Sequence, residues 1–186
     1  MSLESSIASV LRKDPAGRIS FKVDAVAVNK LQMESVAKAI EGSQIAVVVG
    51  GTGSQLGAAY SSWKSRRWNA GETKYIGQIK VGSAAVVNSV MGKAAVFHES
   101  VHAMMDVKNI KIPMHDDEVI AYLADAMYLK ASKLTNVSGG AQEKAIYAAA
   151  FAIIDKHKML TKSGVALKGS DCSALRDAIK AHPAYH

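Results

Sequence analysis

The chain has 186 residues, of which 49% are hydrophobic and 21% are charged, a composition typical of one globular domain with a sizeable core. No apolar run reaches the roughly 18 residues that a membrane-spanning helix needs. The formal net charge is +7, but aromatic residues make up only 6% of the chain and form no stacking motif, which argues against specific nucleic-acid recognition.

The N-terminal region carries Glu4 and has no sustained apolar segment, so no signal peptide is predicted. We therefore expect a cytoplasmic protein, or one exported by a signal-peptide-independent route. Residues 1–186 are expected to form a single domain, and residues 1–17 are left open as a flexible or appended segment. The densest basic cluster, Lys-Ser-Arg-Arg at 64–67, is a weak indication of an anionic partner.

The first half of the chain is expected to be rich in strands. Alternating or β-branched runs predict strands at 18–24, 44–49, 56–63 and 74–82. A helix is predicted over 29–42, because Asn29 and Gln32 stand at the spacing of a capping box and Gly42 is a typical helix stop.

The second half has helical periodicity. Apolar residues recur at helical spacing over 88–107, 116–132, 141–158 and 171–181. Cys172 falls at the start of the last of these helices, with Ser170 or Asp171 as the cap, and we interpret it as a structural or surface residue rather than a nucleophile. Strands followed by helices predict an α+β fold, with a small N-terminal β-sheet, an active-site helix and a helical C-terminal half.

A glycine-rich stretch follows the strand at 44–49 and contains Gly51, Gly53 and Gly57. Glycines in this position can bring the backbone close to a pyrophosphate, but that use requires a helix directly after them. The following residues are poor helix formers, and no acidic residue stands on a second strand at the expected spacing. We therefore favour a tight turn that joins two strands.

The stretch Phe-His-Glu-Ser-Val-His at 97–102 combines residue types that metal chemistry needs. His98 and His102 are one helical turn apart, so both imidazoles project from one face and can bind one zinc ion. In this arrangement Glu99 is the general base that takes a proton from the attacking water. Apolar residues fill the rest of the helix, and placing the polar residues on one stripe is costly unless they have a partner such as a metal.

A third ligand is expected on the next helix. Glu118 lies sixteen residues after His102, enough for a short loop and a return into an antiparallel helix. Pro113 is expected to end the preceding segment, and Asp116 or Asp117 to cap the new helix. On that helix Glu118, Tyr122 and Asp125 fall on one stripe.

These residues resemble those of the zincin-like metallopeptidases, and within them the gluzincin arrangement of His-Glu-x-x-His followed by a glutamate on the next helix. The resemblance covers 94–128 and implies a minimal zincin domain in which His98, His102 and Glu118 bind zinc and Glu99 is the catalytic base. The metzincin variant is excluded, because Lys108 stands in place of its third histidine and Met105 in place of its glycine.

Other roles remain open. His115 is an alternative third ligand, and Asp125 is the first candidate to orient a ligating imidazole. Asp106 is expected to be exposed or to cap its helix. Tyr122 is a candidate for stabilising the oxyanion, with buried packing as the alternative. The resemblance also implies that the strand before the active-site helix, at 74–82, lies along the cleft and pairs with substrate.

The sequence thus predicts a zinc-dependent peptidase that hydrolyses peptide or protein substrates. Two alternatives stay open: a zincin-fold domain that binds metal or a partner without turnover, and an effector or toxin peptidase delivered into another cell.

Overall fold

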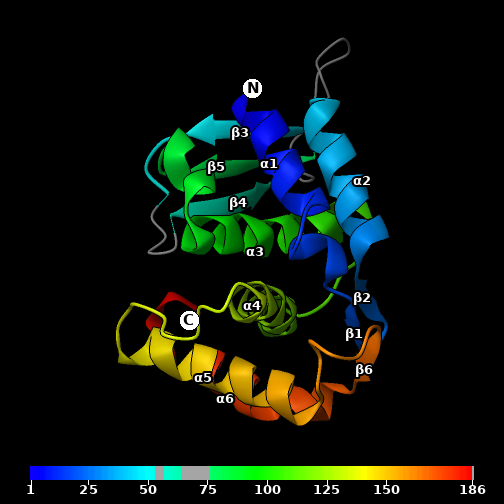
Figure 1. Ribbon diagram of the computed structural model, residues 1–186, viewed down its shortest axis with the longest axis vertical. Coiled ribbons are helices and arrows are strands. Elements are labelled where there is room, and N and C mark those ends of the chain that lie inside the picture. The colour runs from blue at the N-terminus through cyan, green and yellow to red at the C-terminus, as the bar shows by residue number, and fades with distance from the viewer. Residues whose placement is uncertain (53–56, 64–75, 186) are drawn as a thin grey trace.

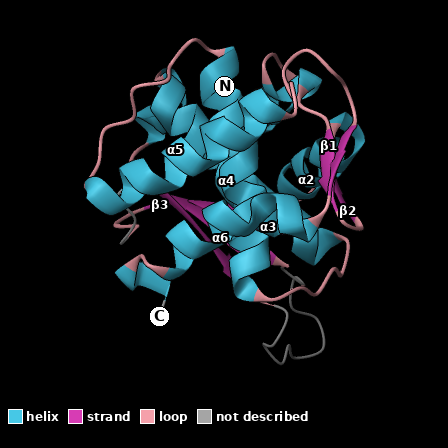
Figure 2. Ribbon diagram, turned by 90° about the horizontal axis from the view of Figure 1, so that it is seen from below, coloured by secondary structure: helices cyan, strands magenta, loops and turns pink. Residues whose placement is uncertain are grey.

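The computed structural model describes residues 1–52, 57–63 and 76–185 of the chain, which adopt an α+β fold as the sequence predicts (Figure 1). An N-terminal half contains one sheet and three long helices, and a helical C-terminal half lies beneath it in the view of Figure 1. Seen from below, the helices fill most of the molecule and the two small sheets lie apart from each other (Figure 2). Among the described residues no helix combines the length and apolar character that crossing a bilayer requires.

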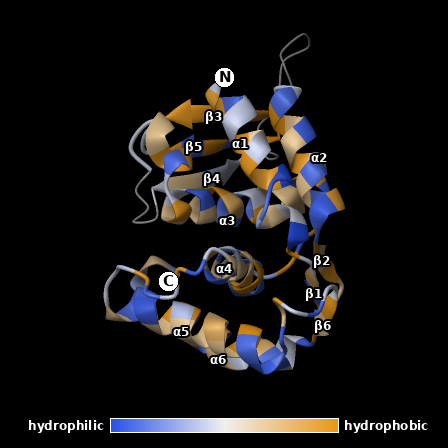
Figure 3. Ribbon diagram, viewed as in Figure 1, coloured by the Kyte–Doolittle hydropathy of each residue, from blue (hydrophilic) through white to orange (hydrophobic). Residues whose placement is uncertain are grey.

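The main sheet has the strand order β3-β5-β4 and is packed against helices. The strands are β3 (Ile45–Val49), β4 (Ala58–Ser62) and β5 (Gly77–Val81). The central strand β5 pairs in parallel with β3 and antiparallel with β4. β3 is uniformly hydrophobic (Figure 3), and α3 (Val90–Val107) contacts both β4 and β5. β4 is therefore the edge strand that lies next to the helix with the two histidines.

Residues 1–17 are not an appended segment, which corrects that expectation. Helix α1 (Leu3–Arg12) packs against α2 (Lys30–Glu41), and its Ile7 and Leu11 are fully buried. Arg12 also donates hydrogen bonds to Glu34 at 2.8 Å and to Glu41 at 2.8 Å, both on α2. The N-terminal helix is thus part of the core.

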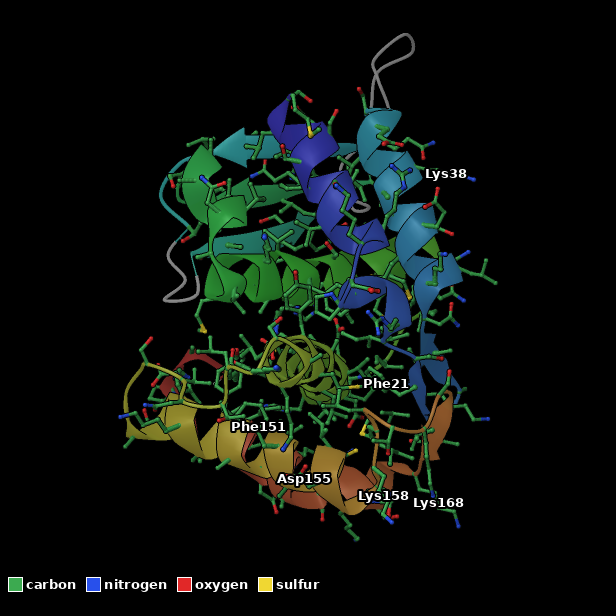
Figure 4. The ribbon with its side chains drawn as sticks, in the orientation of Figure 1. Phe21, Lys38, Phe151, Asp155, Lys158 and Lys168 are labelled. Atoms are coloured by element: carbon green, nitrogen blue, oxygen red, sulfur yellow. The ribbon has the colours of Figure 1, made fainter. Side chains whose placement is uncertain are left out.

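The C-terminal half is built around α4 (Met114–Ala131). α4 contacts α3, α5 (Ala141–Lys156) and α6 (Ser173–Lys180), and residues 119–129 of α4 are all buried. A second small sheet of order β2-β1-β6 lies beside these helices; its strands are β1 (Phe21–Val23), β2 (Val26–Val28) and β6 (Val165–Leu167). Phe21 of this sheet points into the molecule (Figure 4). In the same view Lys38 on α2, Lys158 and Lys168 project away from the molecule.

Most predicted elements are present with small shifts of their ends. Helix α2 begins after Asn29, whose side chain accepts a hydrogen bond from the backbone of Gln32, and ends at Gly42, as predicted. The predicted capping by Asp116 or Asp117 is wrong: α4 already begins at Met114, directly after Pro113, so both aspartates lie inside its first turn. In that position their carboxylates face the positive end of the helix.

The predicted tight turn between two strands is also wrong in its topology. β3 and β4 flank β5 and do not pair with each other, so they are not the neighbouring strands that a tight turn would join. Gly57 has φ of +79°, a conformation that glycine adopts without strain. Gly53 lies outside the described residues.

We expect Gly92→Ala to destabilise the protein, although alanine is the better helix former by about 1 kcal/mol. Gly92 lies in the first turn of α3, and an added Cβ would collide with the backbone carbonyl of Val86. Overpacking of this kind costs about 1–3 kcal/mol, which lowers the melting temperature by roughly 2–12 °C in a chain of this size. Thermal unfolding checks this, with Gly51→Ala as control because no atom of the described residues lies within 4 Å of a Cβ there. An unchanged or higher melting temperature for Gly92→Ala would contradict the collision.

Candidate metal centre and active site

Helices α3 and α4 bring three potential metal ligands together. His98 and His102 project from one face of α3, and Glu118 comes from the first turns of α4. One ligand atom from each lies within 4.8 Å of the others. The structure thus assembles the three residues that the sequence proposed as ligands.

The distances within this cluster match the edges of a small coordination polyhedron. The two Nε2 atoms are 3.2 Å apart, and Glu118 places Oε2 at 3.4 Å from Nε2 of His98 and Oε1 at 3.6 Å from Nε2 of His102. Two donors bound to one tetrahedral zinc at about 2.0–2.1 Å are about 3.3 Å from each other. One ion could therefore contact all three side chains with little rearrangement.

Carboxylates hold the outer nitrogen of each imidazole. Nδ1 of His98 is 3.2 Å from Asp125, which also accepts a hydrogen bond from Tyr147 at 3.0 Å. Nδ1 of His102 is 3.0 Å from Asp117. An ionised carboxylate only accepts hydrogen bonds, so with such a partner Nδ1 carries the ring proton and a neutral ring presents its lone pair at Nε2. Asp125 occupies the orienting position that the sequence predicted, and Asp117 is a second such residue.

The cluster attracts positive charge. In the protein alone, burial opposes ionisation of His98, but hydrogen bonds to Asp125 and Glu118 raise its pKa well above the usual value. Burial likewise opposes ionisation of His102, and Asp117 outweighs it, so that the pKa of His102 is raised. For Glu118, burial favours the neutral form, but the adjacent histidines lower its pKa overall. Oε2 of Glu118 is buried and lies 3.4 Å from Nε2 of His98, and a bound cation would satisfy it.

Glu99 lies next to this cluster and is held by the edge strand. Its Oε2 accepts a hydrogen bond of 2.7 Å from the backbone N–H of Tyr60 in β4. The residue is only 8% exposed, and this burial raises the pKa of its carboxyl group, partly opposed by the neighbouring histidines. A carboxylate with a raised pKa is better matched to accepting a proton near neutral pH.

The cluster and Glu99 open into a cleft of about 770 Å³ between the two halves of the molecule. Its walls come from β4, α3, α4 and the segment 182–185; the contributing residues include Ala58, Tyr60, Ser62, Asp106, Lys111, Glu143, His182 and Tyr185.

The prediction that the strand at 74–82 pairs with substrate is wrong. That strand is β5, whose two edges are already occupied by β3 and β4, and the edge strand at the cleft is β4. Residues 74 and 75 lie outside the described residues.

Tyr122 is 4% exposed and lies behind a second tyrosine. Its ring packs edge-on against His98 with centroids 4.8 Å apart, and its hydroxyl is 2.8 Å from that of Tyr185. Tyr185, in a short 3₁₀ turn (Pro183–Tyr185), also helps to lower the pKa of the Glu118 carboxylate. Both tyrosines line the cleft, and Tyr185 is the less buried of the two. Nothing in the sequence near position 185 signals this role.

The remaining candidate residues lie away from the cluster or have other partners. His115 is not among the clustered ligands, and its Nε2 faces the backbone oxygen of Tyr185 at 3.3 Å. Asp106 is neither exposed nor a cap, because its side chain is partly buried and accepts a hydrogen bond from Tyr60. Cys172 is fully buried and burial raises its pKa to about 11, as suits the predicted structural role. The basic cluster at 64–67 lies outside the described residues.

Comparisons of the chain with protein-family models, with curated proteins and with solved structures found no match.

Proposed function

We propose that the protein is a zinc-dependent peptidase in which His98, His102 and Glu118 bind the metal and Glu99 is the general base. The observation that carries this proposal is the convergence of the three ligand atoms, within 4.8 Å of one another, in the lining of a cleft that also contains Glu99. A cleft with an edge strand along one wall suits an extended peptide, because the edge of a sheet offers backbone hydrogen bonds. In β4 the outward N–H of Tyr60 already donates to Glu99.

The donor set fits zinc. Two imidazole nitrogens and one carboxylate oxygen form a common ligand set of catalytic zinc sites, which keep a fourth position open for water or substrate. Bound zinc would lower the pKa of the attacking water and polarise the scissile carbonyl group. The carboxylates of Asp125 and Asp117 would keep both imidazoles in the tautomer that leaves Nε2 free to bind.

The chain's own groups would then handle the protons. The Glu99 carboxylate accepts a proton from the attacking water and delivers it to the nitrogen of the leaving amine, which breaks the peptide bond. Glu99 is anchored from the N-terminal half through Tyr60, and Tyr185 lies on the opposite side, in the C-terminal half. A substrate carbonyl between them could accept a hydrogen bond from the Tyr185 hydroxyl, with Tyr122 orienting that hydroxyl.

The proposal is tested by metal content and peptide cleavage on one preparation. Protein purified without chelator is analysed for bound metals, and cleavage of a peptide library is followed with and without a chelator. About one zinc ion per chain, together with cleavage that chelation removes and zinc restores, would support the proposal. A chain that takes up no zinc when zinc is offered would refute it.

We expect Tyr185→Phe to lower kcat by about a hundredfold, the lower end of the loss seen when one oxyanion donor is removed. The KM and the zinc content should stay near their wild-type values, because phenylalanine preserves the ring and the three ligands are intact. Steady-state kinetics on a cleaved peptide checks this. Tyr122→Phe is the comparison and should cost less, since it only removes the group that orients Tyr185. A Tyr185→Phe protein with wild-type kcat would exclude the hydroxyl from the reaction.

A further inference from the structure

Tyr60 contacts α3 at two points. Its backbone N–H donates to Oε2 of Glu99 at 2.7 Å, and its hydroxyl donates to Oδ2 of Asp106 at 2.8 Å. Glu99 and Asp106 are seven residues apart on α3, which places them on the same face two turns from each other. One residue of the edge strand therefore binds both the proposed base and a carboxylate farther along the same helix.

The backbone contact uses the edge of β4 that faces away from β5. Gly82 donates to the carbonyl of Gly57 and Trp63 donates to the carbonyl of Ile76, at 2.8 and 2.9 Å. In an antiparallel ladder the hydrogen-bonded pairs alternate, so the N–H and C=O groups of Ala58, Tyr60 and Ser62 point away from β5. Tyr60 thus reaches Glu99 without losing a ladder hydrogen bond, and its position depends on where β4 lies over α3.

The side chain of Tyr60 fixes that position. Its ring lies over Gly77 of β5, where an added Cβ would collide with the hydroxyl end of the ring. With the ring in this position, the hydroxyl donates a hydrogen bond to the partly buried Asp106. The ring is therefore held between a glycine that leaves room for it and a carboxylate on α3.

We propose that Tyr60 is a positioning residue, whose hydroxyl bond to Asp106 locks β4 onto α3 so that its backbone N–H holds the Glu99 carboxylate in place. The inference that this serves catalysis rests on the proposed function. The mechanical part, that the hydroxyl bond secures the amide bond, is independent of it.

Hydrogen exchange tests the mechanical part whether or not the protein turns over a substrate. The exchange rate of the amide of residue 60 is measured by NMR in the wild type, Tyr60→Phe, Asp106→Ala and Asp106→Asn. We expect exchange to become about tenfold faster or more in Tyr60→Phe and Asp106→Ala. Asp106→Asn should stay close to the wild type, because the side-chain oxygen of asparagine still accepts a hydrogen bond from the hydroxyl. Tyr128→Phe is the matched control, a hydroxyl deletion at a buried ring that packs against Phe97.

The catalytic part is tested by kinetics on the same variants. Misplacing a reacting group by about 1 Å can cost up to a hundredfold in rate, so we expect kcat to fall on the order of tenfold in Tyr60→Phe with zinc content unchanged and little effect on KM. The Tyr60→Phe/Asp106→Ala double variant should be no worse than the single variants, since both remove one bond.

Two results would overturn the inference. Unchanged exchange at residue 60 in both Tyr60→Phe and Asp106→Ala would show that the hydroxyl bond does not secure the amide. Faster exchange with wild-type kcat would show that the amide bond does not position the base. A wild type that binds no zinc or cleaves no peptide would instead refute the proposed function, and the exchange rates would still decide the mechanical part.

Discussion

Replacing Glu99 by glutamine is expected to reduce peptide hydrolysis by about 10³- to 10⁴-fold, the upper part of the range for loss of a general base. Glutamine keeps the length of the side chain and still offers an oxygen to the Tyr60 N–H, but it cannot take a proton from water near neutral pH. His98, His102 and Glu118 are untouched, so the zinc content should remain at the wild-type value. Turnover of a cleaved peptide and elemental analysis of the same sample measure the two quantities.

Glu143→Gln is the control for this substitution. Glu143 lines the same cleft but pairs with His182 at 3.1 Å and is not one of the proposed ligands or the base. It should retain most of the activity. If Glu99→Gln retains wild-type activity, Glu99 is not the base. If neither protein nor the wild type cleaves any peptide while all three bind zinc, the metal-binding domain without turnover is the better account.

The fold could be predicted from the sequence where periodicity and capping act within one element. The limits of α2 follow from Asn29 and Gly42, and the long apolar stripes of α3 and α4 predict helices that the structure contains. The order of strands could not be predicted this way, because pairing joins segments far apart in the chain. β5 separates β3 from β4, and only that insertion makes β4 the edge strand at the cleft. The helix at 3–12 is not predicted from the sequence, because the burial of Ile7 and Leu11 depends on their packing against α2.

The candidate site could likewise be predicted from the sequence only in part. His98, Glu99 and His102 share one helix, so their spacing alone places them together, and Glu118 follows from the return of the chain in the next helix. Asp125 was predictable because it is on the same stripe of α4 as Glu118. Tyr60 and Tyr185 come from a strand and a terminal turn, 39 and 63 positions from the residues they contact. No local sequence pattern predicts such contacts, because they join segments that only the tertiary fold brings to the same cleft.

Removing one ligand is expected to abolish stable zinc binding. In Glu118→Ala the zinc content should fall from about one per chain to near zero after dialysis against zinc-free buffer, because two neutral imidazoles alone hold zinc far more weakly than the three-ligand set. Thermal unfolding gives a second reading. A ligand present at a thousand times its Kd stabilises the folded state by about 4 kcal/mol, which corresponds to roughly 8–16 °C for a chain of this size. Added zinc should therefore raise the melting temperature of the wild type by about this amount, and that of Glu118→Ala by much less.

Asp116→Ala provides the matched control, since Asp116 lies in the same helical turn but its carboxylate binds Arg176 at 2.7 Å rather than the cluster. It should bind zinc as the wild type does. Equal zinc content in Glu118→Ala and the wild type would move the third ligand elsewhere, with Asp117 the next candidate because it already contacts His102. If the wild type binds no zinc, a proton rather than a metal ion would lie between the two Nε2 atoms. The carboxylates of Asp125, Asp117 and Glu118 would then stabilise a protonated histidine pair, and Glu99 would have no role in peptide hydrolysis.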